Sequence, residues 1–230
     1  MGFQITKKKP VVSGQPKQPV FFFMGVVIPL VHVLMNIPSK AYCFKMIREM
    51  EMMDHIVAHS IRVSQVAMLL VDCLHAKDCH LNRNLIQAAA LLHDITKTRS
   101  FETHENHAET AQILVRDAGF PEVSQIVGQH VHLWEAPVIG DLKEEEIINY
   151  SDKRVLHDQV VSLEERFEYI MGRYAKNFLD RVRIRSLTEK TKVLEIKLFR
   201  HLPFTPDSLK SQLNPEDFAA ELNTYHMTCR

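Results

Sequence analysis

Histidine is the residue type that stands out in this sequence. The chain of 230 residues holds 13, and nine of them lie between His55 and His132. Neutral imidazoles and ionised carboxylates are the side chains that bind divalent transition metals. The chemistry to look for in this stretch is therefore metal binding, provided that the surrounding elements bring the side chains together.

Spacing places several of these side chains on the buried faces of predicted helices. His59 lies three residues after Ile56 and four before Val63, so it continues an apolar stripe. Similar spacings turn three other residues inward on three other helices: His93, His130 and Asp152. Asp94 directly follows His93, near the end of the same predicted helix.

Two interpretations of these buried polar groups are open. Any one histidine, taken alone, is well explained as a core residue whose hydrogen bonds are satisfied within the fold. Five such groups together are harder to explain in this way, because each one left without a partner costs about 1–3 kcal/mol. The total stability of a domain is only about 5–15 kcal/mol. A shared metal ion would satisfy several groups at once, so the set favours a metal centre.

The elements that must position these groups are predicted to be helices, with no persistent strand pattern and no internal repeat. Ser39 and Asp54 are suitable N-caps for the first two helices, and Ser162 with Glu165 forms a capping box for a later one. The predicted helices cover about 40–53, 55–75, 84–94, 106–118, 121–132, 143–156, 162–175 and 181–199. We therefore expect an all-α fold, a compact helical bundle.

Two terminal segments differ from the helical region at 37–200. Residues 1–36 are expected to be an irregular N-terminal extension, in which residues 1–19 are basic and disordered and residues 20–35 form an apolar run. The run is shorter than the roughly 20 residues of a membrane helix. It is open to three interpretations: a non-essential extension upstream of a start at Met35, a membrane-proximal anchor, or a packed part of the fold. The polar tail at 201–230 is expected to be loosely held.

Composition excludes several other function classes. Lys and Arg number 28, as do Asp and Glu, so the overall charge does not predict binding to nucleic acid or to an anionic membrane. With 7 glycines, the sequence contains neither of the Gly-rich phosphate loops typical of dinucleotide- and ATP-binding folds. The 4 cysteines are far apart and are interpreted as reduced thiols, which predicts a cytoplasmic protein.

The inward-facing polar residues also carry a resemblance to a known family. In order along the chain, His59, the doublet His93-Asp94 and Asp152 resemble the H…HD…D signature of the HD-domain metal-dependent phosphohydrolases. The resemblance covers residues 37 to 174 and implies that residues 37–200 form an HD-type helical domain. Two additional histidines, in HAETA and QHVH, make the chain similar to the bacterial HD-type subgroup that includes diadenosine tetraphosphate hydrolases.

The resemblance implies a helical bundle around one or two divalent transition-metal ions, with iron, manganese or zinc favoured by the mixed ligands. Transferred residue by residue, the ligands implied for a first ion are His59, His93, Asp94 and Asp152. Asp94 would bridge to a second ion, whose implied ligands are His107 and His130. The less favoured ligand candidates are His104 and His132, and the histidines expected at the surface are His55, His75 and His80.

Two cations near these ligands are candidate catalytic contacts to the substrate. Lys97, three residues after the doublet, is the first candidate for binding a phosphate. Arg62, three residues after the first histidine ligand, either faces the mouth of the site or pairs with a carboxylate. The two cations that follow the final aspartate of the signature, Lys153 and Arg154, are expected to lie in solvent.

The resemblance and the residues together predict a metal-dependent phosphohydrolase that cleaves a phosphate ester or anhydride of a nucleotide or similar small molecule. A bound metal ion lowers the pKa of a water toward about 7 and so provides hydroxide at neutral pH. Two alternatives are open: a nucleotide-binding signalling module with the same fold and little turnover, and a purely structural metal site. The complete ligand set argues against the signalling module. The expected partner is a small phosphorylated substrate, with no nucleic acid and with membrane association only through residues 20–35.

Overall fold

The computed structural model describes residues 22–23, 26–27, 35–76, 79–135 and 140–228. The chain divides into two units, Met1–Leu34 and Met35–Arg230. In the first unit, β1 (Phe22–Phe23) pairs with β2 (Val26–Val27) in a short antiparallel hairpin. The predicted disorder of residues 1–19 lies outside the described residues, as does most of the apolar run at 20–35.

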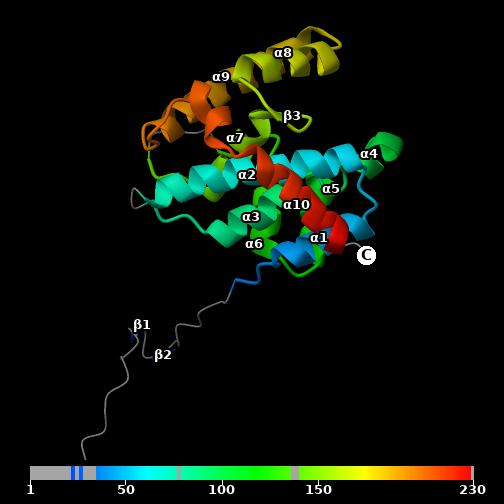
Figure 1. Cartoon of the computed structure of the whole chain (residues 1–230), viewed down its shortest axis with the longest axis vertical. Coiled ribbons are helices and arrows are strands. Elements are labelled where there is room, and N and C mark those ends of the chain that lie inside the picture. The colour runs from blue at the N-terminus through cyan, green and yellow to red at the C-terminus, as the bar shows by residue number, and fades with distance from the viewer. Residues whose placement is uncertain (1–21, 24–25, 28–34, 77–78, 136–139, 229–230) are drawn as a thin grey trace, which may run out of the picture. The chain divides into compact units, whose positions relative to one another are not determined.

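The second unit is helical, apart from one short hairpin among its described residues. Its helices are α1 (Lys40–Glu49), α2 (Asp54–His75), α3 (Arg83–Leu92), α4 (Lys97–Thr103), α5 (His107–Asp117), α6 (Pro121–Val127), α7 (Glu144–Lys153), α8 (Leu163–Tyr174), α9 (Phe178–Phe199), the 3-10 helix η1 (Pro206–Gln212) and α10 (Pro215–Thr228). Figure 1 shows these helices in chain order. The predicted all-α fold is confirmed.

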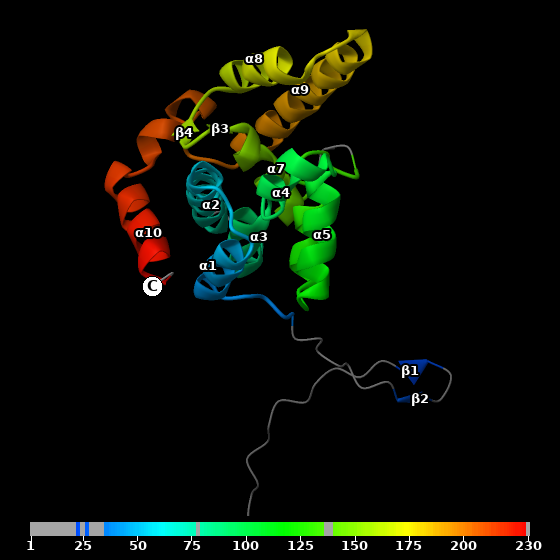
Figure 2. The same ribbon diagram turned by 90° about the vertical axis from the view of Figure 1, so that its right-hand side faces the viewer.

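Helix α2 is the core helix of this unit. It contacts α3, α7 and α10, and Figures 1 and 2 both show it among these neighbours. Its side chains at Ile61, Val63 and Leu70 are fully buried, and each such side chain contributes about 1.5–3 kcal/mol to folding. Within the described residues, α2 alone is long and apolar enough to cross a membrane, but most of it is covered by the surrounding helices.

The ends of several helices lie where the sequence predicts them. Ser39 caps α1 by accepting a hydrogen bond from the Tyr42 backbone N–H, and the Ser162 capping box begins α8. Gly119 follows α5 with a φ of 92°, a backbone conformation that side chains other than glycine rarely adopt. Asp54 is not an N-cap: it is the first residue of α2 and makes no capping hydrogen bond.

Three parts of the helix prediction are wrong. The seven-residue helix α4 was not predicted. The helix predicted over 121–132 ends at Val127, and the one predicted over 143–156 ends at Lys153. The chain then forms a hairpin from β3 (Val155–Leu156) and β4 (Gln159–Val160), which lies against α2.

The expectation of a loosely held C-terminal tail is also wrong. Helix α10 contacts α1 and α2, and Figure 2 shows it beside both. The Tyr225 ring meets the Phe44 ring edge-on, with centroids 5.4 Å apart, and Glu221 pairs with Lys40. These contacts make α10 part of the helical unit.

Candidate metal centre

Five segments of the helical unit bring the predicted metal ligands together. His59 lies in the second turn of α2, and Asp152 lies near the end of α7. His93 and Asp94 occupy the end of α3 and the turn after it. The two additional histidines come from the first residue of α5 (His107) and the turn after α6 (His130).

Local hydrogen bonds fix the turns that carry these ligands. The Thr96 hydroxyl donates to the His107 carbonyl over 2.8 Å, which joins the turn after α3 to the start of α5. The Asn149 side-chain amide donates to the His130 carbonyl over 3.0 Å, which joins the turn after α6 to α7. The relative positions of the ligands are therefore set by the fold rather than by long flexible side chains.

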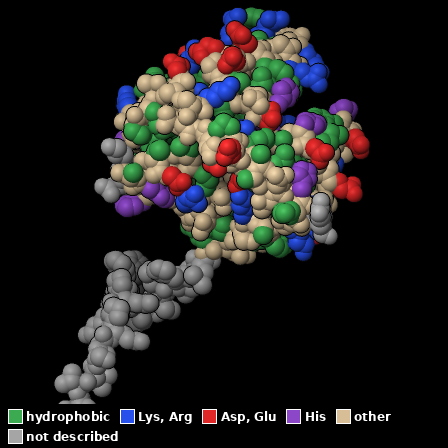
Figure 3. Space-filling view, viewed as in Figure 1, with side chains coloured by type: hydrophobic (Ala, Val, Ile, Leu, Met, Phe, Trp, Pro, Cys, Tyr) green, Lys and Arg blue, Asp and Glu red, His purple; other side chains and the backbone are tan. Residues whose placement is uncertain are grey.

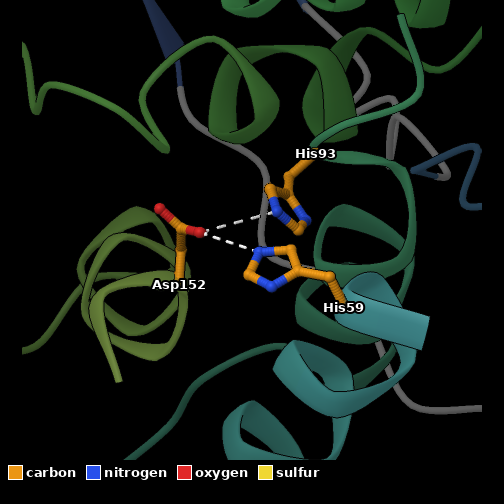
Figure 4. A group of neighbouring side chains, drawn as sticks. All are labelled: His59, His93 and Asp152. Atoms are coloured by element: carbon orange, nitrogen blue, oxygen red, sulfur yellow. Dashed lines mark hydrogen bonds and ion pairs between the residues drawn. The ribbon is translucent and has the colours of Figure 1, made fainter. Parts of the chain in front are cut away.

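The first ligand group consists of His59, His93 and Asp152, whose candidate ligand atoms all lie within 4.8 Å of one another. Figure 4 shows the three side chains pointing toward one another from separate parts of the fold. The Asp152 Oδ1 atom lies 3.1 Å from His59 Nε2 and 3.8 Å from His93 Nε2. All three side chains are buried. Two imidazole nitrogens and a carboxylate oxygen converge on one point, as a transition-metal site requires.

The second ligand group consists of Asp94, His107 and His130. Asp94 Oδ1 lies 3.4 Å from His107 Nε2 and 3.5 Å from His130 Nε2. The other oxygen, Oδ2, faces the first group, at 3.3 Å from His93 Nε2 and 3.9 Å from His59 Nε2. Asp94 thus presents one carboxylate oxygen to each group, which is the arrangement needed by a bridging carboxylate.

Backbone carbonyls orient three of the four imidazoles. The Nδ1 atoms of His59, His93 and His130 lie 2.7–2.8 Å from the carbonyl oxygens of His157, Ala90 and Val127, in that order. Because a carbonyl oxygen only accepts hydrogen bonds, each Nδ1 carries the proton. The neutral ring then presents the bare Nε2 lone pair to the centre, which is the tautomer that binds a metal.

Two polar atoms at the centre are left without partners. His93 Nε2 and Asp94 Oδ1 are buried and have no hydrogen-bond partner in the described part of the chain. Leaving a buried polar group unpaired costs about 1–3 kcal/mol, and more if the group is charged. A divalent cation would satisfy both atoms, so the donor set fits a metal ion.

The surroundings keep the two carboxylates ionised. Burial raises the pKa of Asp94, but the Lys97 ammonium and neighbouring histidines outweigh burial and hold the pKa well below the usual range. The pKa of Asp152 is likewise low: the Lys153 ammonium and the neighbouring His59 and Arg166 side chains outweigh the effect of burial. Both groups therefore remain anionic and able to bind a cation.

Burial keeps most of the imidazoles neutral. It lowers the pKa of His59 and of His130, and it lowers the pKa of His107 to about 4. For His93, burial also lowers the pKa, but the adjacent carboxylates of Asp94 and Asp152 outweigh it and the net shift is upward. A proton and a metal ion therefore compete for His93 Nε2, and metal binding there releases the proton.

The candidate phosphate-binding residue, Lys97, lies at the centre. Its Nζ atom is 2.6 Å from Asp94 Oδ2, and its side chain is 25% exposed. Burial lowers the pKa of Lys97, but the carboxylate of Asp94 outweighs burial and raises it, so the ammonium group stays charged. It also lines the pocket beside the ligands, where a substrate oxygen can reach it.

Arg62 lies outside the pocket lining and forms no ion pair with a carboxylate among the described residues, so it takes neither of its two predicted placements. Its guanidinium stacks on the Phe218 ring of α10, 3.9 Å from the centroid. It also donates hydrogen bonds to the Asp158 carbonyl and to the Gln65 side chain, and it is not among the residues that line the pocket. Arg62 therefore holds α10 and the β3–β4 turn against α2, and the predicted substrate contact is wrong.

Lys153 and Arg154 were expected in solvent, and both are buried. The Lys153 ammonium donates to Asp152 Oδ2 over 2.7 Å and to the His130 carbonyl over 2.9 Å. Lys153 thus links residues of both ligand groups. Arg154 instead stabilises the region behind the site, through hydrogen bonds that include the Pro206 carbonyl.

A pocket of about 560 Å³ adjoins the cluster. Asp152, His107 and His130 contribute to its lining, together with cationic and apolar residues from α4, α8 and α9. The space-filling view shows histidine side chains beside a hollow between the part that carries α8 and the part that carries α4 (Figure 3). The less favoured ligand candidates His104 and His132 also line this pocket.

The histidines predicted to lie at the surface do so. His55, His75 and His80 are exposed. A further contribution to the pocket, Arg166 of α8, was missed by the sequence analysis: its Nη2 atom lies 3.7 Å from Asp152 Oδ1.

Comparison with protein families identifies an HD domain over residues 56–188. This region is more than half of the chain and contains every predicted ligand, so the chain belongs to the HD domain family. Its fold is that of an all-α HD domain, and its His/Asp clusters could hold a metal.

A curated relative is a tRNA (cytidine(56)-2'-O)-methyltransferase from Picrophilus torridus, which is 29% identical over 181 residues. The match covers 71% of this chain and 50% of the relative, so the chain spans about half the length of the curated protein it matches. No solved structure matches the chain. The family and this enzyme relative support enzyme status. The narrower resemblance to diadenosine tetraphosphate hydrolases is not supported by this relative.

Proposed function

We propose that this chain is a metal-dependent phosphohydrolase that cleaves a phosphate ester or anhydride of a nucleotide or similar small molecule. The observation that carries the proposal is the shared carboxylate: Asp94 offers one oxygen to each of two ligand groups. His93 Nε2 and Asp94 Oδ1 have no hydrogen-bond partner among the described residues, and the cluster opens into a pocket. A set of core polar residues satisfied within the fold would show neither feature.

The ligands divide into two sets around Asp94. His59, His93 and Asp152 would hold one ion with Asp94, and His107 and His130 would hold a second. A divalent ion bound there supplies a Lewis acid, which lowers the pKa of a water and neutralises charge on phosphoryl oxygens. In the hydrolysis, the water oxygen bonds to phosphorus, the bond from phosphorus to the leaving oxygen breaks, and the leaving oxygen takes a proton.

Lys97 supplies positive charge from the chain itself. Its ammonium group is held at Asp94 by a single contact of 2.6 Å and is partly exposed to the pocket. When a phosphate enters, Lys97 can donate to a phosphoryl oxygen and neutralise charge that develops there during the displacement. This is a substrate-binding role, distinct from the ligand role of Asp94.

The size and lining of the pocket support a nucleotide-sized substrate. A volume of about 560 Å³ falls within the range of small-molecule sites, which is roughly 300–1,000 Å³. Phe101 of α4 and Tyr174 of α8 both line the pocket and are both more than half exposed. Exposed aromatic rings near an anion site are suited to stacking on a planar base. Methyl transfer, the activity in the relative's name, belongs to a protein about twice as long as the matched region.

The test is metal content combined with turnover. The purified protein is assayed for bound metal and for hydrolysis of phosphomonoesters, dinucleoside polyphosphates and cyclic dinucleotides. We expect His93→Ala and Asp94→Ala to lose metal and to lower turnover by more than about 100-fold, since even residues that only support a ligand contribute about 10–100-fold. His55→Ala is the matched control, because His55 is exposed on the same helix as His59.

Two results would contradict this proposal. Activity retained in Asp94→Ala would remove the shared carboxylate from the chemistry. Metal bound without turnover of any compound in the panel would favour a nucleotide-binding module or a structural metal site. Circular dichroism of each variant distinguishes a lost ligand from a lost fold.

A further inference from the structure

Arg166 projects from the first turns of α8 toward the metal centre. Its side chain is 12% exposed and lines the pocket. The nearest anionic atom is Asp152 Oδ1, 3.7 Å from Nη2, which is longer than a hydrogen bond. The Arg166 Nε atom is buried and has no hydrogen-bond partner in the described residues. The guanidinium is therefore close to the centre without being satisfied by it.

The buried Arg154 is an example of an arginine with a structural role in this protein. Arg154 donates to the Tyr150 hydroxyl over 2.5 Å, to the Val161 carbonyl over 2.8 Å and to the Pro206 carbonyl over 2.9 Å. Its donors are matched by fixed acceptors on three sides. Arg166 has the same charge, with 12% of its side chain exposed against 4% for Arg154, but it lacks such acceptors among the described residues, so the fold leaves its donors available to a ligand.

The charges around the cluster also favour an anion. Three cations, Lys97, Lys153 and Arg166, lie within ion-pair distance of the two buried carboxylates, Asp94 and Asp152. The cations outnumber the carboxylates before any divalent ion is counted. The excess of positive charge at this site therefore favours the binding of an anion.

The other acids that line the pocket do not supply that anion. Glu105 accepts a hydrogen bond from Arg99 over 2.7 Å. Asp180 accepts one from the Lys176 backbone N–H over 3.1 Å. Both are engaged elsewhere, and neither is within ion-pair distance of Arg166.

We propose that Arg166 is a substrate-binding residue that holds two oxygens of the phosphoryl group with its planar, paired N–H donors. A guanidinium matches a phosphate in this bidentate way, whereas an ammonium binds as a point charge. The proposal rests on the proposed function, because it names the group that receives the anion at the same site. It assigns α8 a direct part in substrate binding, in addition to its packing role.

The test measures phosphate binding and turnover separately. Inorganic phosphate is titrated by calorimetry into the full chain supplemented with Mn²⁺, using Arg166→Met and Arg166→Lys. Arg173→Met is the matched control, because Arg173 is exposed on the same helix and lies outside the pocket lining. We expect the Kd for phosphate to rise at least about 10-fold in Arg166→Met, to recover in part in Arg166→Lys, and to stay unchanged in Arg173→Met.

Steady-state kinetics with an active substrate distinguish a substrate-binding role from a purely structural one, because only the former changes KM more than kcat. Arg166→Met should raise KM more than it lowers kcat, and Arg166→Lys should recover part of KM. Phosphate binding that is equally tight in wild type and Arg166→Met would overturn the proposal, as would a wild type that does not bind phosphate. If phosphate binding depends on Arg166 but no compound is hydrolysed, the role of Arg166 stands and the phosphohydrolase proposal fails.

Discussion

Replacing Asp94 with asparagine separates the stability provided by a bound metal from that provided by the side chain. In the metal-free protein, the new amide oxygen can still accept from Lys97, as Asp94 Oδ2 does now at 2.6 Å. The new NH₂ group takes the place of Oδ1, which faces the Nε2 atoms of His107 and His130 at 3.4 and 3.5 Å. It can donate a hydrogen bond there, but Lys97 loses its ionised partner, so we expect metal-free Asp94→Asn to be less stable than wild type by about 1.5–3 kcal/mol.

With metal, the two proteins should differ clearly. An ion that binds only the folded state, present at a concentration of 100 times its Kd, stabilises that state by about 2.7 kcal/mol. For a unit of this size, about 1 kcal/mol moves the unfolding midpoint by about 2–4 °C, so Mn²⁺ should raise the wild-type Tm by roughly 5–11 °C. If the substitution weakens binding about a thousandfold, the same Mn²⁺ concentration adds less than ~0.1 kcal/mol.

Thermal unfolding followed by far-ultraviolet circular dichroism measures both quantities. Chelator-treated wild type and Asp94→Asn are compared with and without Mn²⁺, and His55→Ala serves as a control with the ligands intact. Equal Mn²⁺-induced shifts in wild type and Asp94→Asn would refute the reasoning. The converging side chains would then be a polar network within the core.

Two further predictions concern pH and the two cations first chosen from the sequence. Burial holds the pKa of His107 at about 4, below its ordinary value of 6.5. The unfolded chain therefore binds this proton first as the pH falls. The free energy of unfolding of the metal-free protein should decrease between pH 6.5 and 4, by up to about 3 kcal/mol from His107 alone. The raised pKa of His93 acts in the opposite direction. Removing the His107 contribution in metal-free His107→Asn should therefore make the free energy of unfolding, measured with urea, less dependent on pH than in wild type. An unchanged pH dependence would contradict the low pKa of His107. Lys97→Ala should raise KM more than it lowers kcat. Arg62→Ala should leave KM and kcat within about twofold of wild type, and it should reduce the free energy of unfolding by about 0.5–1 kcal/mol through the lost Phe218 contact. Equal kinetic losses in the two variants would contradict these different placements.

Helical periodicity explains why most of the convergence could be predicted from sequence. His59 and Asp152 lie in apolar stripes, and a residue's place in such a stripe fixes the side of the helix that it faces. Both are buried, as the spacing requires. His107 is the first residue of its helix, where no preceding turn defines a stripe. It was identified through the family resemblance instead.

The cations around the ligands could not be predicted in this way. Lys153 follows Asp152 directly, so helical geometry alone directs it to a different face. The helix ends there, however, and the chain continues into the hairpin against α2. Arg166 belongs to an amphipathic helix whose place above the pocket is set by tertiary packing, which its own sequence does not reveal.

Helix α4 and the C-terminal helix escaped prediction from the sequence for different physical reasons. Helix α4 has seven residues and buries none of them, so it shows no apolar period. The C-terminal region does contain a short stripe, since Phe218, Leu222 and Tyr225 follow a spacing of four and three and pack against the core. The polar composition around that stripe led to the prediction of a loose tail.

The β3–β4 turn has a consequence for the ligand on α2. The carbonyl oxygen that accepts the hydrogen bond from His59 Nδ1–H belongs to His157, whose backbone is left-handed with a φ of 54°. Lengthening this turn by one residue would displace the acceptor without altering any ligand. The imidazole could then place its proton on either nitrogen, and metal affinity would fall through tautomer exchange. A turn at the surface thus determines, through one hydrogen bond, which ring nitrogen of a buried ligand carries the proton, although ligand and turn lie 98 positions apart in the chain.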